Sequence, residues 1–426
     1  MLYRLETDTV LTMDDEFHIF RPGQITWQDG TIISAGPVGH ESIAVDQLIK
    51  VPGGILLPGL YNGHNHAAMT LFRGLADDSP IFEWLQKHIW PREAKLTADD
   101  IYMGTLLAAV EMIKSGTVGY ADMYFEMDQV AKATKESGLR AWLSRGLVGH
   151  DDAALDKLSE AADFAGRFRH DPLITPMLGP HAPYTCSPDY LERVAEVADA
   201  HHLGVHIHLA ESQDEMDDLQ KEFGLTPIQI AAQAGLFQVP VLIAHGVHIT
   251  RTDLPYLENL KGGVVSCPIS NAKLGNGILP YPLLKEAGIA VGLGTDGAAS
   301  TNSLDMFQEM KAMAWMQKVK EGRPEAFRAQ TALTLATRGT ASVLGFPGGI
   351  LETGRPADFI VVDSQKAHMT PEIDSVANVV YAATGADVLY TVVNGQILLA
   401  EGMLTMLDEA DIRREAQARA RRLVSE

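Results

Sequence analysis

The feature that most constrains the fold of this chain is a regular alternation between short apolar segments and helical stretches. Eight such alternations over about 290 residues predict a (β/α)8 barrel of the TIM type, an α/β fold, with insertions. A doubly wound open sheet is the alternative, but no GxGxxG follows the first apolar segment. The eight segments are LLPGLYNGHNH, TVGYADMY, LRAWLSRGLV, LITPMLGPH, LGVHIHLAE, PVLIAHG, GGVVSC and IAVGLGTDG.

The two ends of the chain have a different character from the middle. Residues 1 to 57 read as short strands punctuated by glycine, and ADFIVVDS and VLYTVVNGQILLAEG near the other end read the same way. Asn394-Gly395 between two apolar runs is a strong hairpin signal. We therefore predict one small β-sandwich domain formed by residues 1–57 and 350–405, a barrel over 58–349, and a polar, exposed helix over 406–426.

Several helix starts are marked by local signals. Thr97 and Asp100 have the spacing of a capping box before a helix over 98–115. Ser187-Pro188 and Thr226-Pro227 each combine an N-cap hydroxyl with proline at the first helical position. These signals place helices between the predicted barrel strands.

Charge and cysteine content exclude some classes of function. The chain has 426 residues, and 34 Lys and Arg against 55 Asp and Glu give a net charge of −21. A phosphate backbone would be repelled, so nucleic acid is not the expected partner. No apolar run approaches the ~20 residues of a membrane helix, and acidic residues stand where a signal peptide would be apolar. With only two cysteines, we expect a cytoplasmic protein with reduced thiols; self-association stays open.

Polar side chains recur where the predicted barrel strands end, which is where barrel enzymes carry their chemistry. Five of the eight strand ends carry such residues. In order these are His64-Asn65-His66, His181, His208 with Glu211 three residues on, His245, and Asp296.

His64 and His66 are two residues apart, so on a strand both point to the same side. With His208 and Asp296 they would make a set of four nitrogen and oxygen ligands that suits zinc and leaves a position for water. An isolated HxH would be no more than two polar residues at a strand end, and the recurrence at the barrel ends favours the metal interpretation. His206 shares the face of His208 but lies one pleat deeper, so His208 is the preferred ligand.

Glu211 and Asp296 are the candidates for proton transfer. Glu211 lies just beyond a ligand, near the metal yet free to titrate, as a general acid or base must be. Asp296 lies in GLGTDGAAS, a glycine-rich strand end that lets a ligand approach the backbone. The plain alternatives are a solvent-facing loop glutamate and an Asp-Gly turn.

At PGLYNGHNHAAMTLFRG the chain resembles the amidohydrolase superfamily. Within it, the sequence is similar to the methylthioadenosine/S-adenosylhomocysteine deaminase group, near the triazine hydrolases. The resemblance covers nearly the whole chain and implies a distorted barrel with a β-sandwich built from both chain ends. Its other motifs include KSGTVGYADMYF, GPHAPYTCS, HIHLAES, AHGVH, CPISNAKLGNGI and GLGTDGAASTNSLDMFQEM.

The resemblance also implies a cofactor and a division of roles. It implies one divalent metal ion per subunit, usually Zn²⁺, held by His64, His66, His208 and Asp296. His245 would hold and orient the attacking water. LITPMLGPH has no lysine to bridge two metals, which favours a single ion. The substrate contacts of the family fall on Trp84, Glu93, Arg145 and His181, together with Glu211 and Asp296.

One departure bears on the substrate. Some members carry a further arginine shortly after the strand-three arginine, associated with a homocysteine tail. Here the stretch after Arg145 is GLVGHDDAALDKL, with Asp151-Asp152 in that place. A carboxylate-bearing tail is therefore disfavoured and a neutral methylthio tail favoured, although Lys157 or a neighbouring subunit could substitute.

The resulting hypothesis is hydrolytic deamination of a small purine nucleoside at C6. Glu211 protonates N1, Asp296 takes a proton from the attacking water, and His245 stabilises the developing oxyanion. The first alternative is deamination or dechlorination of another N-heterocycle, such as an s-triazine or a free base. The second is a scaffold without activity, but such a protein would have lost some ligands, and here every position is filled.

Overall fold

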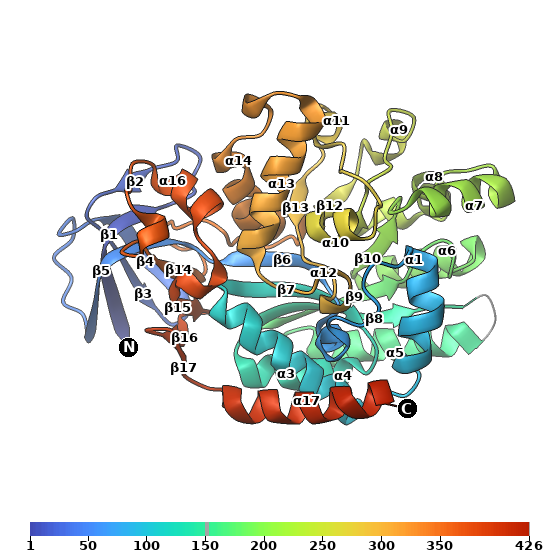
Figure 1. Cartoon of the computed structure of the whole chain (residues 1–426), viewed down its shortest axis with the longest axis horizontal. Helices are drawn as coiled ribbons and strands as arrows, with labels where there is room; N and C mark the ends of the chain where they lie inside the picture. Colours follow the sequence, from blue (N-terminus) through green and yellow to red (C-terminus); the bar gives the residue numbers. More distant parts are fainter. Residues whose placement is uncertain (150–152, 426) are drawn as a thin grey trace.

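The computed structural model of the chain describes residues 1–149 and 153–425. Eight parallel strands follow one another in chain order and form a barrel (Figure 1). These strands correspond one to one with the eight predicted segments. They are β6 (Leu60–Asn65), β7 (Thr117–Tyr124), β8 (Arg140–Leu147), β9 (Ile174–Pro180), β10 (Gly204–Leu209), β11 (Pro240–His245), β12 (Lys261–Ser266) and β13 (Val291–Leu293).

Hydrogen bonds beyond the strand ladder close the barrel between its last strand, β13, and its first strand, β6. No strand ladder joins β13 to β6 in the described residues. The Asn62 side chain instead donates to Thr295 Oγ1 at 2.7 Å and accepts from Thr295 N at 3.0 Å. Asp296 N donates to His64 O at 2.9 Å. The closure of the barrel therefore brings the first and last strand ends of the candidate site together.

Helices surround the barrel, and the capping signals lie where the sequence placed them. Thr97 and Asp100 form a capping box at α3, and Ser187 and Thr226 accept from the third residue of α6 and α8. The longer outer helices are α3 (Ala98–Lys114), α4 (Met127–Ser137), α5 (Ala153–Phe168), α6 (Pro188–His201), α7 (Gln213–Phe223), α8 (Pro227–Gln233) and α13 (Met306–Glu321).

Short helices cover the ends of the barrel strands. A pair of short helices with a π-helical turn between them follows β6, and further short helices follow β12 and β13. These elements are α1 (Ile81–Glu83), η2 (Trp84–Ile89), α2 (Trp90–Glu93), α10 (Pro268–Lys273) and α12 (Ala298–Thr301). The described helices include none that is long and apolar enough to cross a membrane.

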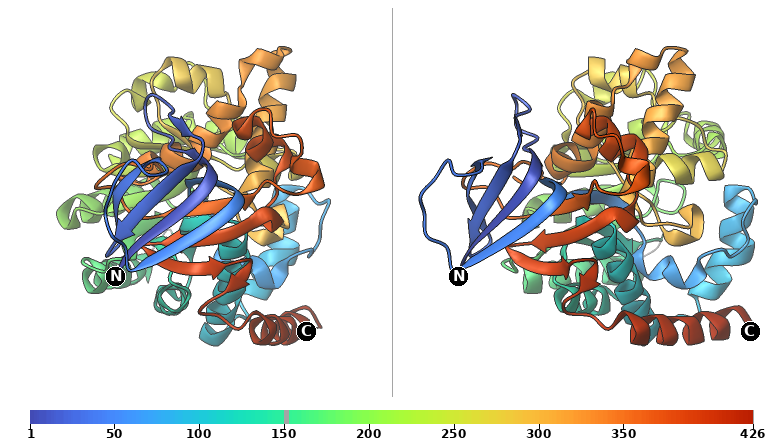
Figure 2. Two further views of the ribbon diagram at one scale, coloured as in Figure 1. Left: turned by 90° about the vertical axis from the view of Figure 1, so that its left-hand side faces the viewer. Right: turned by 60° about the vertical axis from the view of Figure 1, so that its left-hand side comes forward.

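The two chain ends form a separate nine-stranded sheet, shown from two further sides in Figure 2. The N-terminal and C-terminal strands join where β5 pairs antiparallel with β14. The members are β1 (Leu2–Leu11), β2 (Ile19–Phe20), β3 (Gly23–Gln28), β4 (Thr31–Pro37), β5 (Gln47–Pro58), β14 (Phe359–Asp363), β15 (Val388–Val393), β16 (Gln396–Ala400) and β17 (Met403–Leu404). The predicted hairpin at Asn394-Gly395 joins β15 to β16.

This sheet curls over its own apolar core. Trp27 on β3 and Phe359 on β14 are separated by two strands in the sheet order, yet their rings lie 5.0 Å apart, edge to face. Trp27 Nε1 also donates to Gly395 O at 2.9 Å. The sheet thus packs on itself like a small sandwich, in agreement with the predicted fold class.

The final helix, α17 (Glu409–Ser425), is less exposed than its polar sequence predicts. It runs beneath α3 and α4 in Figure 1 and buries Ile412, Ala416 and Leu423. Arg419 and Arg422 donate to the buried Asp100 carboxylate at the start of α3. The helix is therefore docked on the barrel, because its few apolar residues recur on one face.

Candidate active site

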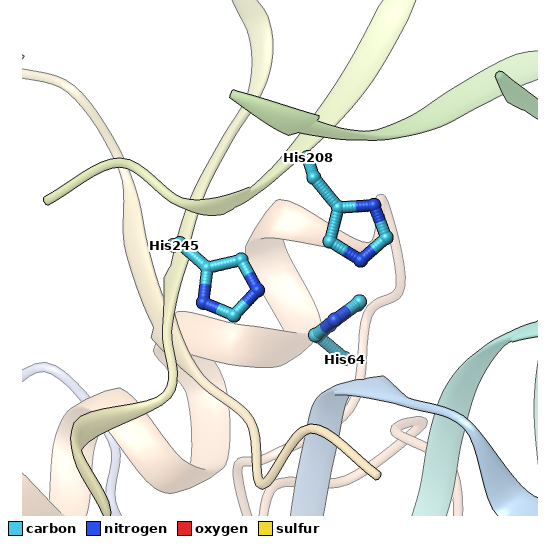
Figure 3. Close-up of side chains that lie close together, drawn as sticks. All are labelled: His64, His208 and His245. Atoms are coloured by element: carbon cyan, nitrogen blue, oxygen red, sulfur yellow. The ribbon is translucent and has the colours of Figure 1, made fainter. Parts of the chain in front are cut away.

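Four histidines and one aspartate from four strand ends converge on one point. His64 on β6 is followed by His66, and His208, His245 and Asp296 come from β10, β11 and the end of β13. Asp296 Oδ1 lies 3.4 Å from His64 Nε2 and 3.3 Å from His66 Nε2, and the His66 and His208 Nε2 atoms lie 3.3 Å apart. The side chains of His64, His208 and His245 converge from three strands, with the His64 ring edge-on to the other two (Figure 3).

Hydrogen bonds on the far side of the rings decide which nitrogen faces this point. His66 Nδ1 donates to Met123 O at 2.6 Å, and His208 Nδ1 donates to His181 O at 2.8 Å. His245 Nδ1 lies 2.8 Å from Asn271 Oδ1. Because these oxygens only accept, each Nδ1 carries the proton and each Nε2 keeps its lone pair.

The donor set fits a divalent metal ion. His64 Nε2 is buried and has no hydrogen-bond partner within the described part of the chain. A buried polar atom of this kind is rare without a partner such as an ion or water. Three imidazole nitrogens and one carboxylate oxygen are ligands that zinc takes readily.

Asp296 is held so that one oxygen faces the imidazoles. Ser270 and Ser300 donate to Oδ2, each at 2.6 Å, while Oδ1 accepts from Gly297 N at 2.7 Å. Burial disfavours the charged form of Asp296, but these three donors to its two oxygens favour it. The carboxylate is therefore ionised and can accept a proton or bind a cation.

Glu211 lies beside the cluster and, unlike the ionised Asp296, is protonated at neutral pH. Its Oε1 accepts from Asn276 Nδ2 at 3.0 Å, and its Oε2 lies 3.7 Å from His245 Nε2. Burial, reinforced by the charge of Asp296, raises the pKa of Glu211 to about 8. At neutral pH it is a proton donor next to an ionised carboxylate, a pairing that supports acid–base chemistry.

Three strand ends around the site have strained backbones. Ala210, His245 and Asp296 adopt φ values of 55°, 70° and 66°, in the left-handed region that residues with a Cβ avoid. Such conformations cost about 1–3 kcal/mol each and persist where the surroundings enforce them, often at functional sites. Here they direct side chains across the mouth of the barrel.

A cavity of about 570 Å³ opens above the cluster. Its floor is formed by His66, His208, Glu211, His245 and Asp296, and its walls are mostly apolar. Among the described lining residues there is no lysine or arginine. The wall residues include Met69, Ile81, Trp84, Leu85, Ile89, Trp90, Glu93, Tyr124, Phe125, Val148, His181, Tyr184 and Leu274.

Three of the four predicted substrate contacts line this cavity. Trp84 is buried in η2. Glu93 at the end of α2 accepts from Tyr124 OH at 2.7 Å, and burial raises its pKa. His181 Nδ1 lies 2.9 Å from Thr185 Oγ1, and burial lowers the pKa of His181 to about 4.

Arg145 is not among the residues that line the cavity. Its guanidinium lies 2.5 Å from a carboxylate oxygen of Glu160 on α5, while the neighbouring Gly146 lines the cavity. Local sequence could not reveal this pairing, because Glu160 lies on the helix after the strand. Asp151 and Asp152, which bear on the predicted tail preference, lie outside the described residues.

Several residues that hold the site were missed by sequence reasoning. Ser270, Asn271 and Asn276 lie in the CPISNAKLGNGI segment, so their place in a recognised motif was a usable signal. Ser300 has no comparable signal beyond its closeness to Asp296. Each of these side chains bonds a residue of the site rather than lining the cavity.

The model of the amidohydrolase family matches residues 55–398, which is most of the chain. This chain belongs to the amidohydrolase family. As an amidohydrolase it is a hydrolase of carbon–nitrogen bonds. The matched region begins in β5 and ends in β16, so it spans the whole barrel.

Curated relatives align over nearly the full length of this amidohydrolase. A 5-methylthioadenosine/S-adenosylhomocysteine deaminase of Pelotomaculum thermopropionicum is 45% identical over 98% of both chains. A 5'-deoxyadenosine deaminase of Methanosarcina acetivorans is 43% identical over 98% of this chain and 97% of its own. A crystal structure of an adenosine deaminase from Xanthomonas campestris with bound zinc has a TM-score of 0.96 and 31% identity, and covers 100% of this chain and 99% of its own.

Proposed function

We propose that this amidohydrolase removes the 6-amino group of a purine nucleoside with a small neutral 5' substituent, 5'-methylthioadenosine first, giving the inosine analogue and ammonia. The observation that carries the proposal is the convergence of Glu211 and Asp296 with His66, His208 and His245 on the floor of one apolar cavity, where burial raises the pKa of Glu211. S-adenosylhomocysteine and adenosine are the further candidate substrates, and S-adenosylhomocysteine is expected to react more slowly. The relatives named for deamination of adenosine derivatives support the same class.

The cofactor in this proposal is one Zn²⁺ per subunit. His64, His66, His208 and Asp296 would hold it, and when bound it would lower the pKa of water and so supply the attacking nucleophile. The zinc in the Xanthomonas campestris structure supports the identity of the ion. The buried, free thiols of Cys186 and Cys267 fit the expected cytoplasmic setting.

The residues of the chain divide the proton transfers between them. His245 accepts a hydrogen bond from the attacking water at Nε2, because its Nδ1 donates to Asn271. A bare Nε2 cannot donate to the developing oxyanion, so this role of orienting the water replaces the oxyanion stabilisation expected from the sequence. Asp296 takes one proton from that water as the new C6–O bond forms, and Glu211 gives its proton to N1. When the C6–N bond breaks, Asp296 passes its proton to the leaving ammonia, and the C6 hydroxyl proton returns to Glu211.

The walls of the cavity supply the substrate preference. Glu93 uses one carboxylate oxygen for Tyr124, which leaves the other to accept from ribose hydroxyls. Trp84 would pack on the nucleoside, and His181 would accept from a polar group of the substrate at Nε2. Because the described lining includes no lysine or arginine, a carboxylate-bearing tail would be desolvated without a partner.

The experiment is a measurement of ammonia release by the zinc-loaded protein. The substrates are 5'-methylthioadenosine, S-adenosylhomocysteine, adenosine, adenine, guanine and an aminotriazine. Fast release from methylthioadenosine and slow release from S-adenosylhomocysteine support the proposal. Release from only a free base or the triazine would contradict the nucleoside assignment.

A matched variant tests the ribose contact. Glu93→Gln should lose rate on adenosine but change little on 2',3'-dideoxyadenosine, which lacks the hydroxyls that Glu93 would bind. An equal loss on both compounds would contradict the role proposed for Glu93.

A further inference from the structure

A buried chain of hydrogen bonds runs beneath the candidate metal site. His64 Nδ1 lies 2.7 Å from Nε2 of His206, the residue one pleat deeper on β10. His206 Nδ1 lies 3.1 Å from Ser144 Oγ on β8, and that hydroxyl donates to Asp122 O on β7 at 2.7 Å. The His64, His206 and Ser144 side chains are all buried.

His64 differs from the other histidines of the site in its hydrogen-bond partner. His66 and His208 donate to backbone carbonyls and His245 to an amide oxygen, so their tautomers are fixed by oxygens that only accept. His64 instead faces another imidazole, and an imidazole nitrogen can donate or accept. One proton lies between the two rings, and the direct contact alone does not decide which ring carries it.

The remaining hydrogen bonds of the series, from His206 to Ser144 and from Ser144 to Asp122, decide which ring carries the proton. The Ser144 hydroxyl has one proton, and its shortest contact is a carbonyl oxygen, which only accepts. Ser144 therefore accepts from His206 Nδ1, so His206 carries its proton there and its Nε2 has a free lone pair. His64 must then donate from Nδ1, which leaves the lone pair of His64 Nε2 directed at Asp296 Oδ1.

We propose that His206 and Ser144 are positioning residues that fix His64 in the tautomer able to bind the metal. The Asp122 carbonyl oxygen only accepts, and it thereby sets the direction of all three hydrogen bonds between it and His64. Without Ser144, His206 could turn its proton towards His64, and His64 would then carry its own proton on Nε2 and could not act as a ligand. This inference rests on the proposed role of His64 as a metal ligand.

The first test measures zinc affinity of the full chain by competition with a chromogenic chelator. Ser144→Ala should weaken zinc binding about 10-fold, in the range found for residues that hold metal ligands. Thr117→Val is the matched control, because the Thr117 hydroxyl is also buried on a barrel strand but has no hydrogen-bond partner in the described structure. Equal affinity in the two variants would overturn the proposal.

Two substitutions of His206 separate the two bonds. An amide oxygen of glutamine reaches the place of Nε2 and can accept from His64, whereas asparagine reaches only the place of Nδ1. His206→Gln should therefore retain more zinc affinity than His206→Asn. The reverse order would count against the relay.

A spectroscopic signature reads the tautomer directly. In metal-free protein labelled with ¹⁵N-histidine, the His64 signal, identified by its loss in His64→Ala, should show a protonated Nδ1 and a bare Nε2. In Ser144→Ala part of this signal should move to the other tautomer. A protonated Nε2 in the unsubstituted protein would refute the assignment.

His64→Ala distinguishes failure of the relay from failure of the proposed ligand set. If His64→Ala binds zinc as tightly as the unsubstituted protein, His64 is not a ligand and the ligand set itself is wrong. If His64→Ala loses zinc while Ser144→Ala does not, the ligand set stands and the relay alone is wrong.

Discussion

At the scale of single residues, the site places two carboxyl groups in opposite protonation states within one cluster. Asp296 is surrounded by hydrogen-bond donors and imidazoles, whereas Glu211 is buried with one amide donor, Asn276, and the charge of Asp296 nearby. Burial raises the pKa of both carboxyl groups, so the difference between their protonation states comes from the hydrogen-bond donors around each. A site of this kind can donate and accept protons at one pH.

Glu211→Gln should bind metal and substrate but lose turnover by about 10²–10⁴-fold, because the amide keeps the shape and loses the proton. The measurement is kcat for ammonia release, with zinc content and substrate affinity determined on the same samples. Glu222→Gln, on the exposed face of α7, is the matched control and should keep full activity. Full activity in Glu211→Gln would contradict the role of Glu211.

The raised pKa of Glu211 sets the expected pH dependence. A donor must be protonated, and this carboxyl stays protonated until the pH reaches about 8, so kcat/KM should fall as the pH rises above that value. The Asn276 hydrogen bond favours the ionised form, so Asn276→Leu should move the alkaline limb to higher pH. A limb that stays in place in this variant would show that another group titrates.

At the scale of elements, the proposed metal ligands come from strand ends that neighbouring elements hold in place. The short helix α10 carries both Ser270 and Asn271, which bond Asp296 and His245. Helix α12 carries Ser300, the second donor to Asp296. The segments after β12 and β13 thus hold the side chains in place, while the strand ends carry the proposed ligands.

Helix α17 offers a test of stability at this scale. Asp100 is buried at the start of α3. Burial raises its pKa, but hydrogen bonds from the Thr97 hydroxyl and backbone N, together with the Arg419 and Arg422 guanidinium groups, hold the pKa at about 2. Arg419→Ala should lower the free energy of unfolding in urea by about 1–3 kcal/mol at neutral pH, because a buried carboxylate loses a charged donor.

The depressed pKa of Asp100 gives the sign of the pH effect. The ionised, paired form is present above the ordinary carboxyl pKa, so the difference between Arg419→Ala and the unsubstituted protein should shrink as the pH falls towards about 2. Arg421→Ala, exposed on the same helix, is the control and should change stability by less than about 0.5 kcal/mol. Equal losses in both variants would show that α17 is not held by this pair.

At the scale of the whole molecule, one buried carboxylate joins the barrel to the sheet of the chain ends. Asp358, just before β14, accepts from Arg140 Nε and Nη2 at 3.1 and 3.3 Å and from Tyr61 OH at 3.1 Å. It also accepts from Asn394 N at 2.6 Å, in the β15–β16 hairpin. Residues from both sheets thus meet on a single side chain.

Arg140→Met should lower the free energy of unfolding by about 3–5 kcal/mol, because it leaves Asp358 buried and charged without a cation. Arg140→Met combined with Asp358→Asn should recover more than half of that loss, since the unpaired charge is gone. The measurement is urea unfolding at neutral pH. Arg193→Ala, which breaks an exposed ion pair with Glu196 on α6, is the control and should lower the free energy of unfolding by less than about 1 kcal/mol. An equally small loss in Arg140→Met would show that Arg140 does not stabilise the buried Asp358 carboxylate.

Much of the fold could be predicted because its signals are local. The eight strand segments, the caps at Thr97, Ser187 and Thr226, and the Asn394-Gly395 hairpin each depend on neighbouring residues in the sequence. The packing of α17 was missed because its apolar face is narrow and its buried ion pairs join positions more than 300 residues apart.

For the site, the sequence by itself determined which residues meet, because parallel strands in chain order bring all their carboxyl ends to one side of the barrel. That reasoning placed His64, His66, His208, His245, Glu211 and Asp296 together. The chemical roles of these residues stay predictions, as do the limits of the two domains.

Only the tertiary structure decided how these residues are held. It directed Arg145 to Glu160, set His206 beneath His64, gave Asp296 its two serines, and left Glu211 buried with a raised pKa. The physical reason is that ring tautomers and carboxyl pKa values depend on side chains across the barrel, 142 positions apart in the case of His64 and His206. Those partners become neighbours only when the ring of strands closes.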